Sequence, residues 1–251
     1  MDNATKRDLK KQDQFVSLTE HGVEWAKQNR QSAIVSAAIV IVVVLAIIGS
    51  YSLYQRRSAS AATDFGAAMQ IYGTPIQTPG QPVPPGTKTF NSEKERADKA
   101  NAAFLAVASK YGMTPSGKMA RYFAGLTYMD EGQNASAEDT LKTVASSWNK
   151  DLAALGKEAL AQLYQQTGRD SQAADLFNDL AKGDAATVPP GLAKIELAEM
   201  YQAEGKTDEA KKIYAELKDK DKDAKGEPGA AAELATEKLN PKAADQGPQM
   251  Q

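Results

Sequence analysis

Beyond residue 115, apolar and small residues return in one fixed pattern. A tyrosine, a glycine, an alanine and a large apolar residue occur three times with nearly the same internal spacing, at offsets of 36 and then 37 residues. A repeat of this length is one helix-turn-helix unit, so the pattern predicts an all-α, tetratricopeptide repeat (TPR)-like solenoid that binds proteins. An ordinary amphipathic bundle has helical periodicity but gives no reason for a fixed offset. The three sets are Tyr128, Gly132, Ala137 and Leu141; Tyr164, Gly168, Ala173 and Phe177; and Tyr201, Gly205, Ala210 and Tyr214.

Small residues recur in both helices of each predicted unit. In this position they allow two helix backbones to approach closely, while the large residues fill the space beside them. The repeated glycine follows each first helix, where a left-handed carboxy-terminal cap favours glycine. The small residues stand at 125, 161 and 198 in the first helices and at 137, 173 and 210 in the second.

A split unit is predicted upstream of the three complete ones. Residues 92–111 resemble the second helix of an earlier repeat, and its first helix would be Ala61–Tyr72. Residues 73–91 contain five prolines and should form a surface loop. The segment Pro79-Gly80-Gln81-Pro82 has the form of a PxxP ligand, but a spacer loop is the preferred interpretation.

The carboxy-terminal end predicts a capping helix and a tail. Ala231, Leu234, Ala235 and Leu239 form one apolar stripe, as expected for a helix that covers the exposed core of the last repeat. We assign residues 56–239 to the repeat domain and expect residues 240–251 to be disordered.

A long apolar run precedes the repeats. No charged residue occurs between Arg30 and Arg56. At about 1.5 Å per residue, residues 32–54 reach roughly 34 Å, enough for a hydrocarbon core of about 30 Å. We therefore predict a transmembrane helix over residues 32–55. The alternative is a cleaved signal peptide, because Ala59-Ser60-Ala61 fits a small-x-small cleavage pattern, but the leader and the apolar run are long for one.

The charges around the apolar run give a weaker topology signal. Lys27 and Arg30 on one side are matched by Arg56 and Arg57 on the other, and only the more distant basic residues favour a cytoplasmic amino terminus. We expect residues 1–31 to form a cytoplasmic tail, which holds either a short interfacial helix or a partly ordered segment. The protein would then be a single-pass bacterial inner-membrane protein with a periplasmic repeat domain.

Composition argues against several classes of function. A formal net charge of −2, with dispersed basic residues, disfavours nucleic-acid binding. The chain has no cysteine and one histidine, His21, which leaves no catalytic triad. We predict no enzyme activity, cofactor, metal or small-molecule substrate. The carboxylates are expected on solvated faces, with no pair in an apolar setting.

The remaining candidate site is the concave face of the solenoid, formed by the outward side of each first helix. Its mixture of flexible apolar and polar side chains suits an extended or unfolded protein client. A clamp for a peptide carboxylate is disfavoured, because this face lacks the Lys and Asn that such a clamp uses. The predicted lining consists of Met119, Tyr122, Leu126, Met129, Leu155, Glu158, Gln162, Gln165, Leu192, Ile195, Glu199 and Gln202.

The whole layout resembles the bacterial ancillary SecYEG translocon subunit family. The resemblance covers about residues 12–240 and rests on the single span, the basic-aromatic stretch before it and the TPR-like repeats. It implies partners among translocon components, emerging secreted proteins and periplasmic chaperones. The Pro-rich insertion departs from a compact repeat.

Two functions follow from this sequence. The first is a membrane-anchored adaptor that binds newly translocated or unfolded envelope proteins or chaperones near the Sec translocon. The second is a scaffold that organises an envelope complex, such as outer-membrane assembly or cell division, without handling clients.

Overall fold

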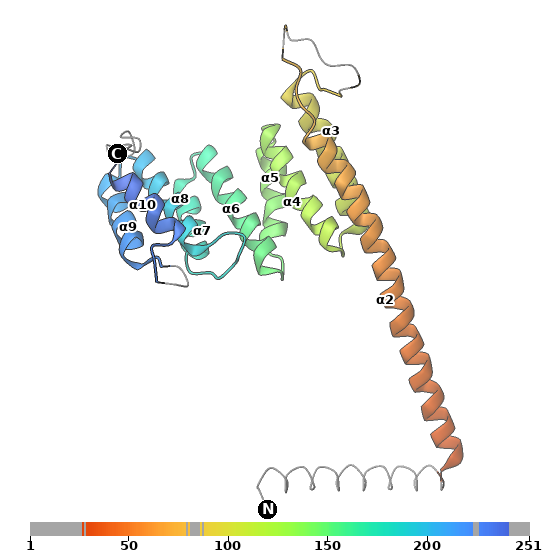
Figure 1. The fold of residues 1–251 in the computed structure, drawn as a ribbon. Coiled ribbons are helices and arrows are strands. Elements are labelled where there is room, and N and C mark those ends of the chain that lie inside the picture. The colour runs from red at the N-terminus through yellow and green to blue at the C-terminus, as the bar shows by residue number, and fades with distance from the viewer. Residues whose placement is uncertain are drawn as a thin grey trace, which may run out of the picture. The chain divides into compact units, whose positions relative to one another are not determined.

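The computed structural model describes residues 27, 29–78, 80, 86, 88–222 and 226–240, and these residues form nine α-helices (Figure 1). The chain divides into two compact units, Met1–Arg57 and Ser58–Gln251. The predicted interfacial helix, His21, nearly all of the PxxP segment and the tail after Asn240 lie outside the described residues.

The first unit contains most of the apolar run. This run belongs to α2, which extends over Arg30–Tyr72 without interruption. Its most apolar window has a mean hydropathy of 2.9 and no buried residue, so α2 is long and apolar enough to span a membrane. The helix also continues through Ser58-Ala59-Ser60, as the predicted Ala61–Tyr72 helix requires.

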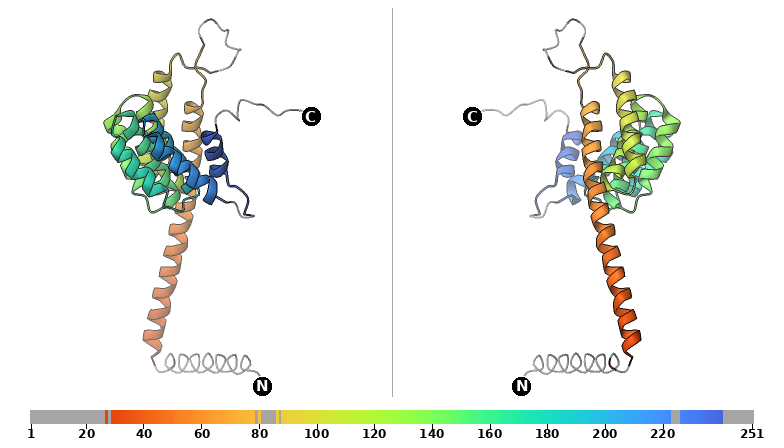
Figure 2. Two further views of the ribbon diagram at one scale, coloured as in Figure 1. Left: turned by 90° about the vertical axis from the view of Figure 1, so that its left-hand side faces the viewer. Right: turned by 90° about the vertical axis from the view of Figure 1, so that its right-hand side faces the viewer.

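The second unit is a series of helical hairpins (Figures 1 and 2). The predicted all-α TPR-like fold and its three complete helix pairs are confirmed, and each helix from α3 to α10 contacts the next in the chain. The first pair joins the end of α2 to α3 (Glu93–Tyr111). The later pairs are α4 (Pro115–Asp130) with α5 (Asn134–Ala145), α6 (Lys150–Gln166) with α7 (Asp170–Leu180), and α8 (Pro190–Ala203) with α9 (Thr207–Lys220); α10 (Ala230–Leu239) follows.

The first hairpin is held by aromatic side chains. Phe65 and Tyr72 of α2 contact Phe104 of α3 and Phe123 of α4, with ring centroids 5.3–6.0 Å apart across the cluster. Such ring pairs stabilise a core beyond the area they bury. Asp64 adds hydrogen bonds from Lys110 Nζ and Tyr111 Oη, at 3.1 and 2.9 Å.

The ends of the Pro-rich segment are fixed to each other. The backbone N–H of Gln77 donates to the Phe90 carbonyl at 2.8 Å, and the Phe90 N–H donates to the Pro75 carbonyl at 3.0 Å. The described ends of this loop therefore meet at the top of the first hairpin, and the aromatic cluster forms without a short inter-helix turn.

The repeated tyrosine and glycine act together at the end of each first helix. The three repeated glycines have φ of 71°, 69° and 79°, which confirms the predicted left-handed caps. Between α4 and α5, the Gly132 N–H donates to the Met129 carbonyl and the Gln133 N–H donates to the Tyr128 carbonyl. This pair of hydrogen bonds is a Schellman arrangement. The Tyr164 and Tyr201 carbonyls accept the equivalent bonds.

The small residues permit the predicted close approach of helices. A Cβ on Gly125 would lie 2.5 Å from Leu141 Cδ2, and a Cβ on Gly156 would lie 2.6 Å from the Ala145 backbone N. The repeated alanines are at most 1% exposed. This packing confirms the structural role assigned to the small positions.

The last helix caps the stack as predicted, although Leu234 of the predicted stripe is exposed. Ala231 and Ala235 of α10 join the buried cluster of α8 and α9 that contains Tyr214. Asp221 fixes the start of α10, because its carboxylate accepts a 3.1 Å hydrogen bond from the Ala232 N–H.

Candidate protein-binding site

The predicted binding residues lie on α4, α6 and α8, the first helices of the three complete pairs. The first two of these helices come close, since α4 contacts α6 as well as its own partner α5. We call the surface formed by the twelve predicted residues the inner face.

The apolar part of the inner face is half-buried. Tyr122, Leu126 and Met129 of α4, with Leu155 of α6, pack against the main core cluster while each keeps part of its side chain accessible. Met119, Gln162 and Gln165 are also half-buried. Since the core holds one side of Tyr122, Leu126, Met129 and Leu155, their accessible side is a preorganised apolar surface.

Carboxylates on this face carry raised pKa values. Burial, followed by the nearby Glu196 carboxylate, raises the pKa of Glu158. Burial, followed by Glu199, raises the pKa of Glu196, although Lys238 opposes the shift. Neither Glu158 nor Glu196 forms an ion pair with another described residue. The prediction that every carboxylate lies on a solvated face was therefore wrong for these two.

Tyr122 belongs to the same electrostatic group. Its pKa is raised by burial first, and then by the charge of Glu158 and by Tyr72. The charge of Glu158 on α6 therefore disfavours ionisation of the Tyr122 phenol on α4. The inner face thus combines an apolar floor with uncompensated negative charge.

The carboxy-terminal end of the inner face is partly covered. Ile195 is only 5% exposed, because it packs with Tyr214 and the α10 alanines. Glu199 pairs with Lys238 of α10 at 2.5 Å. Leu192 and Gln202 remain exposed. Of the predicted residues on α8, Ile195 is therefore part of the capped core and is not accessible.

Glu196 is the inner-face residue that the sequence pattern did not indicate. It follows Ile195 directly and falls outside the repeat positions that project to the concave side. Burial in the folded protein and the nearby Glu199 carboxylate raise the pKa of Glu196. The spacing of the repeats contains no signal for such a shift.

Within the described residues, no group of three or more His, Cys, Asp or Glu is placed to hold a metal ion. A family described as a tetratricopeptide repeat-like domain matches residues 24–182, more than half of the 251-residue chain. The chain belongs to this family. The tetratricopeptide repeat-like match runs from the apolar helix to α7, and α8 with α9 extends the same pattern beyond it.

The family assignment gives the general class of activity. Tetratricopeptide repeat-like helices form a protein-interaction fold without chemistry of its own, so the repeat domain is suited to binding protein partners. Neither a curated protein nor a solved structure matches the chain significantly.

Proposed function

We propose that this protein is a membrane-anchored, non-enzymatic adaptor of the bacterial cell envelope. In this proposal α2 crosses the inner membrane, the amino terminus is cytoplasmic and the repeat domain is periplasmic. The repeats bind newly translocated or unfolded envelope proteins, or their chaperones, near the Sec translocon. The layout of one apolar helix followed by TPR-like repeats supports this assignment.

The chemistry of the inner face carries the client-binding part of the proposal. Its half-buried apolar side chains include the adaptable Met119 and Met129, which suit apolar segments of varied shape. Glu158 and Glu196 add negative charge without a paired cation among the described residues. A client segment that mixes apolar and basic residues would complement both features.

Peptide binding to the full chain in nanodiscs tests this preference. Two labelled peptides of equal length, one apolar-basic and one apolar-acidic, are titrated by fluorescence anisotropy. We expect the basic peptide to bind roughly fivefold or more tightly, and Glu158→Gln with Glu196→Gln to remove most of the difference. Asp175→Asn on the exposed side of α7 is the matched control. Equal affinity for both peptides would reject the proposed client chemistry.

Photo-crosslinking in cells tests the cellular assignment. A crosslinker at Gln162 on the inner face is compared with one at the exposed Lys211 on α9. Adducts from Gln162 with translocon components and with many secretory chains would support the adaptor. A single folded partner in constant stoichiometry would instead support the envelope scaffold.

A further inference from the structure

A second surface lies at the turns between the hairpins and consists of residues outside the predicted inner-face set. Apart from the apolar run, only four large hydrophobic side chains in the described residues are more than a third exposed: Met113, Trp148, Leu192 and Leu234. Trp148 reaches 102% and Met113 reaches 85%, whereas the other two stay below 40%. A fully exposed indole adds nothing to the core, so its whole surface is available for contact with another molecule.

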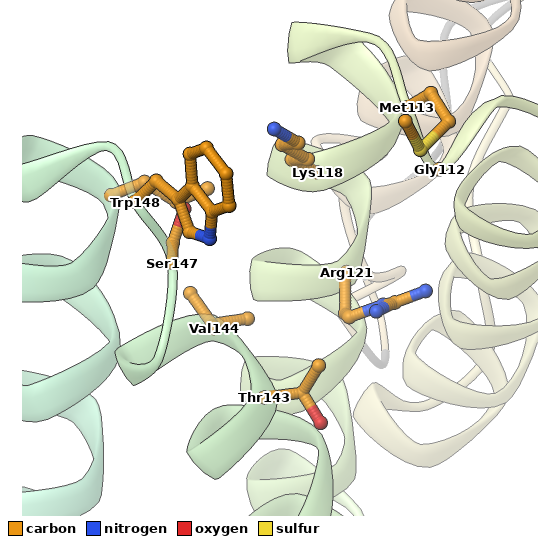
Figure 3. A pocket seen from close by; sticks show the side chains of 9 residues that line it. Gly112, Met113, Lys118, Arg121, Thr143, Val144, Ser147 and Trp148 are labelled. Atoms are coloured by element: carbon orange, nitrogen blue, oxygen red, sulfur yellow. The ribbon is translucent and has the colours of Figure 1, made fainter.

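The two most exposed side chains line the same cavity. This cavity has a volume of about 410 Å³ and lies between the α3–α4 turn, α4 and the α5–α6 turn. Val144 and Leu152 provide further apolar lining. Figure 3 shows the Trp148 indole on one side of the opening and the Lys118 amine extending toward it from the other. Both the size and the mixed lining are typical of sites that hold one side chain of a ligand.

The cations at this cavity are not neutralised. Lys118 and Arg121 both come from α4, but Figure 3 shows the Lys118 amine directed toward Trp148 and the Arg121 guanidinium directed away from it. Neither has an ion-pair partner among the described residues. We call Met113, Lys118, Arg121 and Trp148 the tryptophan edge.

The adjoining cavity on the other side of Trp148 lacks this excess charge. It contains Lys150 and Lys157, but these pair with Asp184 at 2.6 Å and Asp179 at 2.5 Å. The positive excess is therefore confined to the side of the indole that faces Lys118. A broad anionic surface such as a lipid bilayer would also meet the two exposed aspartates, which disfavours it as the partner.

We propose that the tryptophan edge docks a partner protein through a short segment in which an aromatic side chain stands beside acidic residues. The aromatic ring packs on Trp148 and Met113, and the carboxylates pair with Lys118 and Arg121. Tryptophan and arginine are enriched among residues that dominate binding energies, and charge pairing sets the register. This partner is opposite in charge to the basic client proposed for the inner face, so the two surfaces select different proteins.

Tryptophan fluorescence gives a direct test in the full chain in nanodiscs. The sequence has two tryptophans, Trp25 and Trp148, so Trp25→Phe leaves Trp148 as the single reporter. The probes are a short peptide with phenylalanine between two aspartates, the same peptide with asparagines, and the same peptide with alanine for phenylalanine. We expect the first peptide to shift the Trp148 emission to shorter wavelength and to protect it from acrylamide. The other two should bind at least about tenfold more weakly.

Variants locate the binding and separate it from the inner face. Trp148→Ala, followed by peptide anisotropy, and Lys118→Glu should each weaken binding of the acidic-aromatic peptide by at least about tenfold without changing thermal unfolding, since both side chains are exposed. Lys211→Glu, an exposed charge reversal on α9, should leave the affinity unchanged, and Glu158→Gln on the inner face should not weaken binding.

Three results would overturn the proposal. The first is equal peptide affinity in the wild type, Trp148→Ala and Lys118→Glu. The second is an emission shift that follows the phosphatidylglycerol content of the nanodisc and not the peptide, which would indicate a membrane contact. The third is a shift that depends only on protein concentration, which would indicate a second copy of the chain.

Discussion

Two half-buried carboxylates in neighbouring helices behave in opposite ways. Glu138 on α5 accepts hydrogen bonds from Lys142, Arg169 and Tyr164, at 2.8, 2.8 and 3.2 Å. These bonds, with Lys142 the largest cause and Arg169 next, lower the pKa of Glu138 to about 2. Glu158 on α6 has no such partner, and burial raises its pKa.

Glu138 therefore stabilises contacts between helices, whereas the charge of Glu158 has no paired cation among the described residues. Glu138 links α5 to Arg169, at the start of α7, and to Tyr164 of α6, so its charge is satisfied within the fold. Glu158 is partly desolvated without compensation, which costs free energy in the isolated protein. A basic ligand at the inner face would supply the missing partner, and three stability measurements test this contrast.

The largest effect should come from the close contact between α5, which carries Glu138, and α6, which carries Glu158. Gly156→Ala places a Cβ 2.6 Å from the Ala145 backbone N, so α5 and α6 must move apart. We expect a loss of about 1–3 kcal/mol in the free energy of unfolding, measured by circular dichroism during chemical denaturation. Gly66→Ala on α2 is the matched control, because no atom lies within 4 Å of its new Cβ. It should be neutral or stabilising, and equal stability of the two variants would contradict this account of the packing.

An intermediate effect is expected at the satisfied carboxylate. Glu138→Gln removes charged hydrogen bonds and should cost roughly 1–2 kcal/mol at pH 7. Because the folded-state pKa is depressed, this contribution exists above the unfolded pKa of 4.5 and disappears as the pH falls toward about 2. Denaturation at several pH values should therefore show the wild-type advantage shrinking below pH 4.5. The neighbouring exposed variant Asp139→Asn serves as the control, and an advantage that persisted to pH 2 would reject the mechanism.

The smallest effect should have the opposite sign. Glu158→Gln removes a desolvated charge near Tyr122 of α4 and Glu196 of α8, so stability at pH 7 should rise by about 0.5 kcal/mol. A raised folded-state pKa favours the folded protein below the unfolded value of 4.5, and this advantage is lost as the pH rises through the folded pKa. The variant and the wild type should thus converge in acid. Asp175→Asn should show neither the gain nor the convergence, and a destabilised Glu158→Gln would mean that this carboxylate has a structural partner.

Much of the fold could be predicted because its determinants are local and repeated. Tyr128 and Gly132 mark a helix end wherever the spacing recurs, and Gly125 marks a close contact whose partner, Leu141, lies in the next helix. The extension of α2 to Tyr72 followed from helical residues on both sides of a short linker. Hydrophobic spacing is sufficient for such features.

The proposed binding surfaces were less predictable because they depend on contacts between different repeats. Ile195 has the spacing of an inner-face residue, and only the docking of α10 removes it from that surface. The raised pKa of Glu196 and the exposure of Trp148 could not be predicted either, because neither residue belongs to the repeat pattern. Periodicity predicts which side chains point outward from a helix, but not which neighbouring element then covers them.

The paired backbone bonds between Pro75, Gln77 and Phe90 have a consequence for how this protein can evolve. These bonds fix the two described ends of the Pro-rich loop to each other. Insertions and deletions between these ends should therefore leave the aromatic packing of the first hairpin in place. The entropy of closing such a loop grows only with the logarithm of its length, about 0.6 kcal/mol for each doubling. The first hairpin can therefore acquire or lose a sizeable surface module by simple changes in length, whereas the tight glycine turns of the later hairpins leave almost no room for such variation.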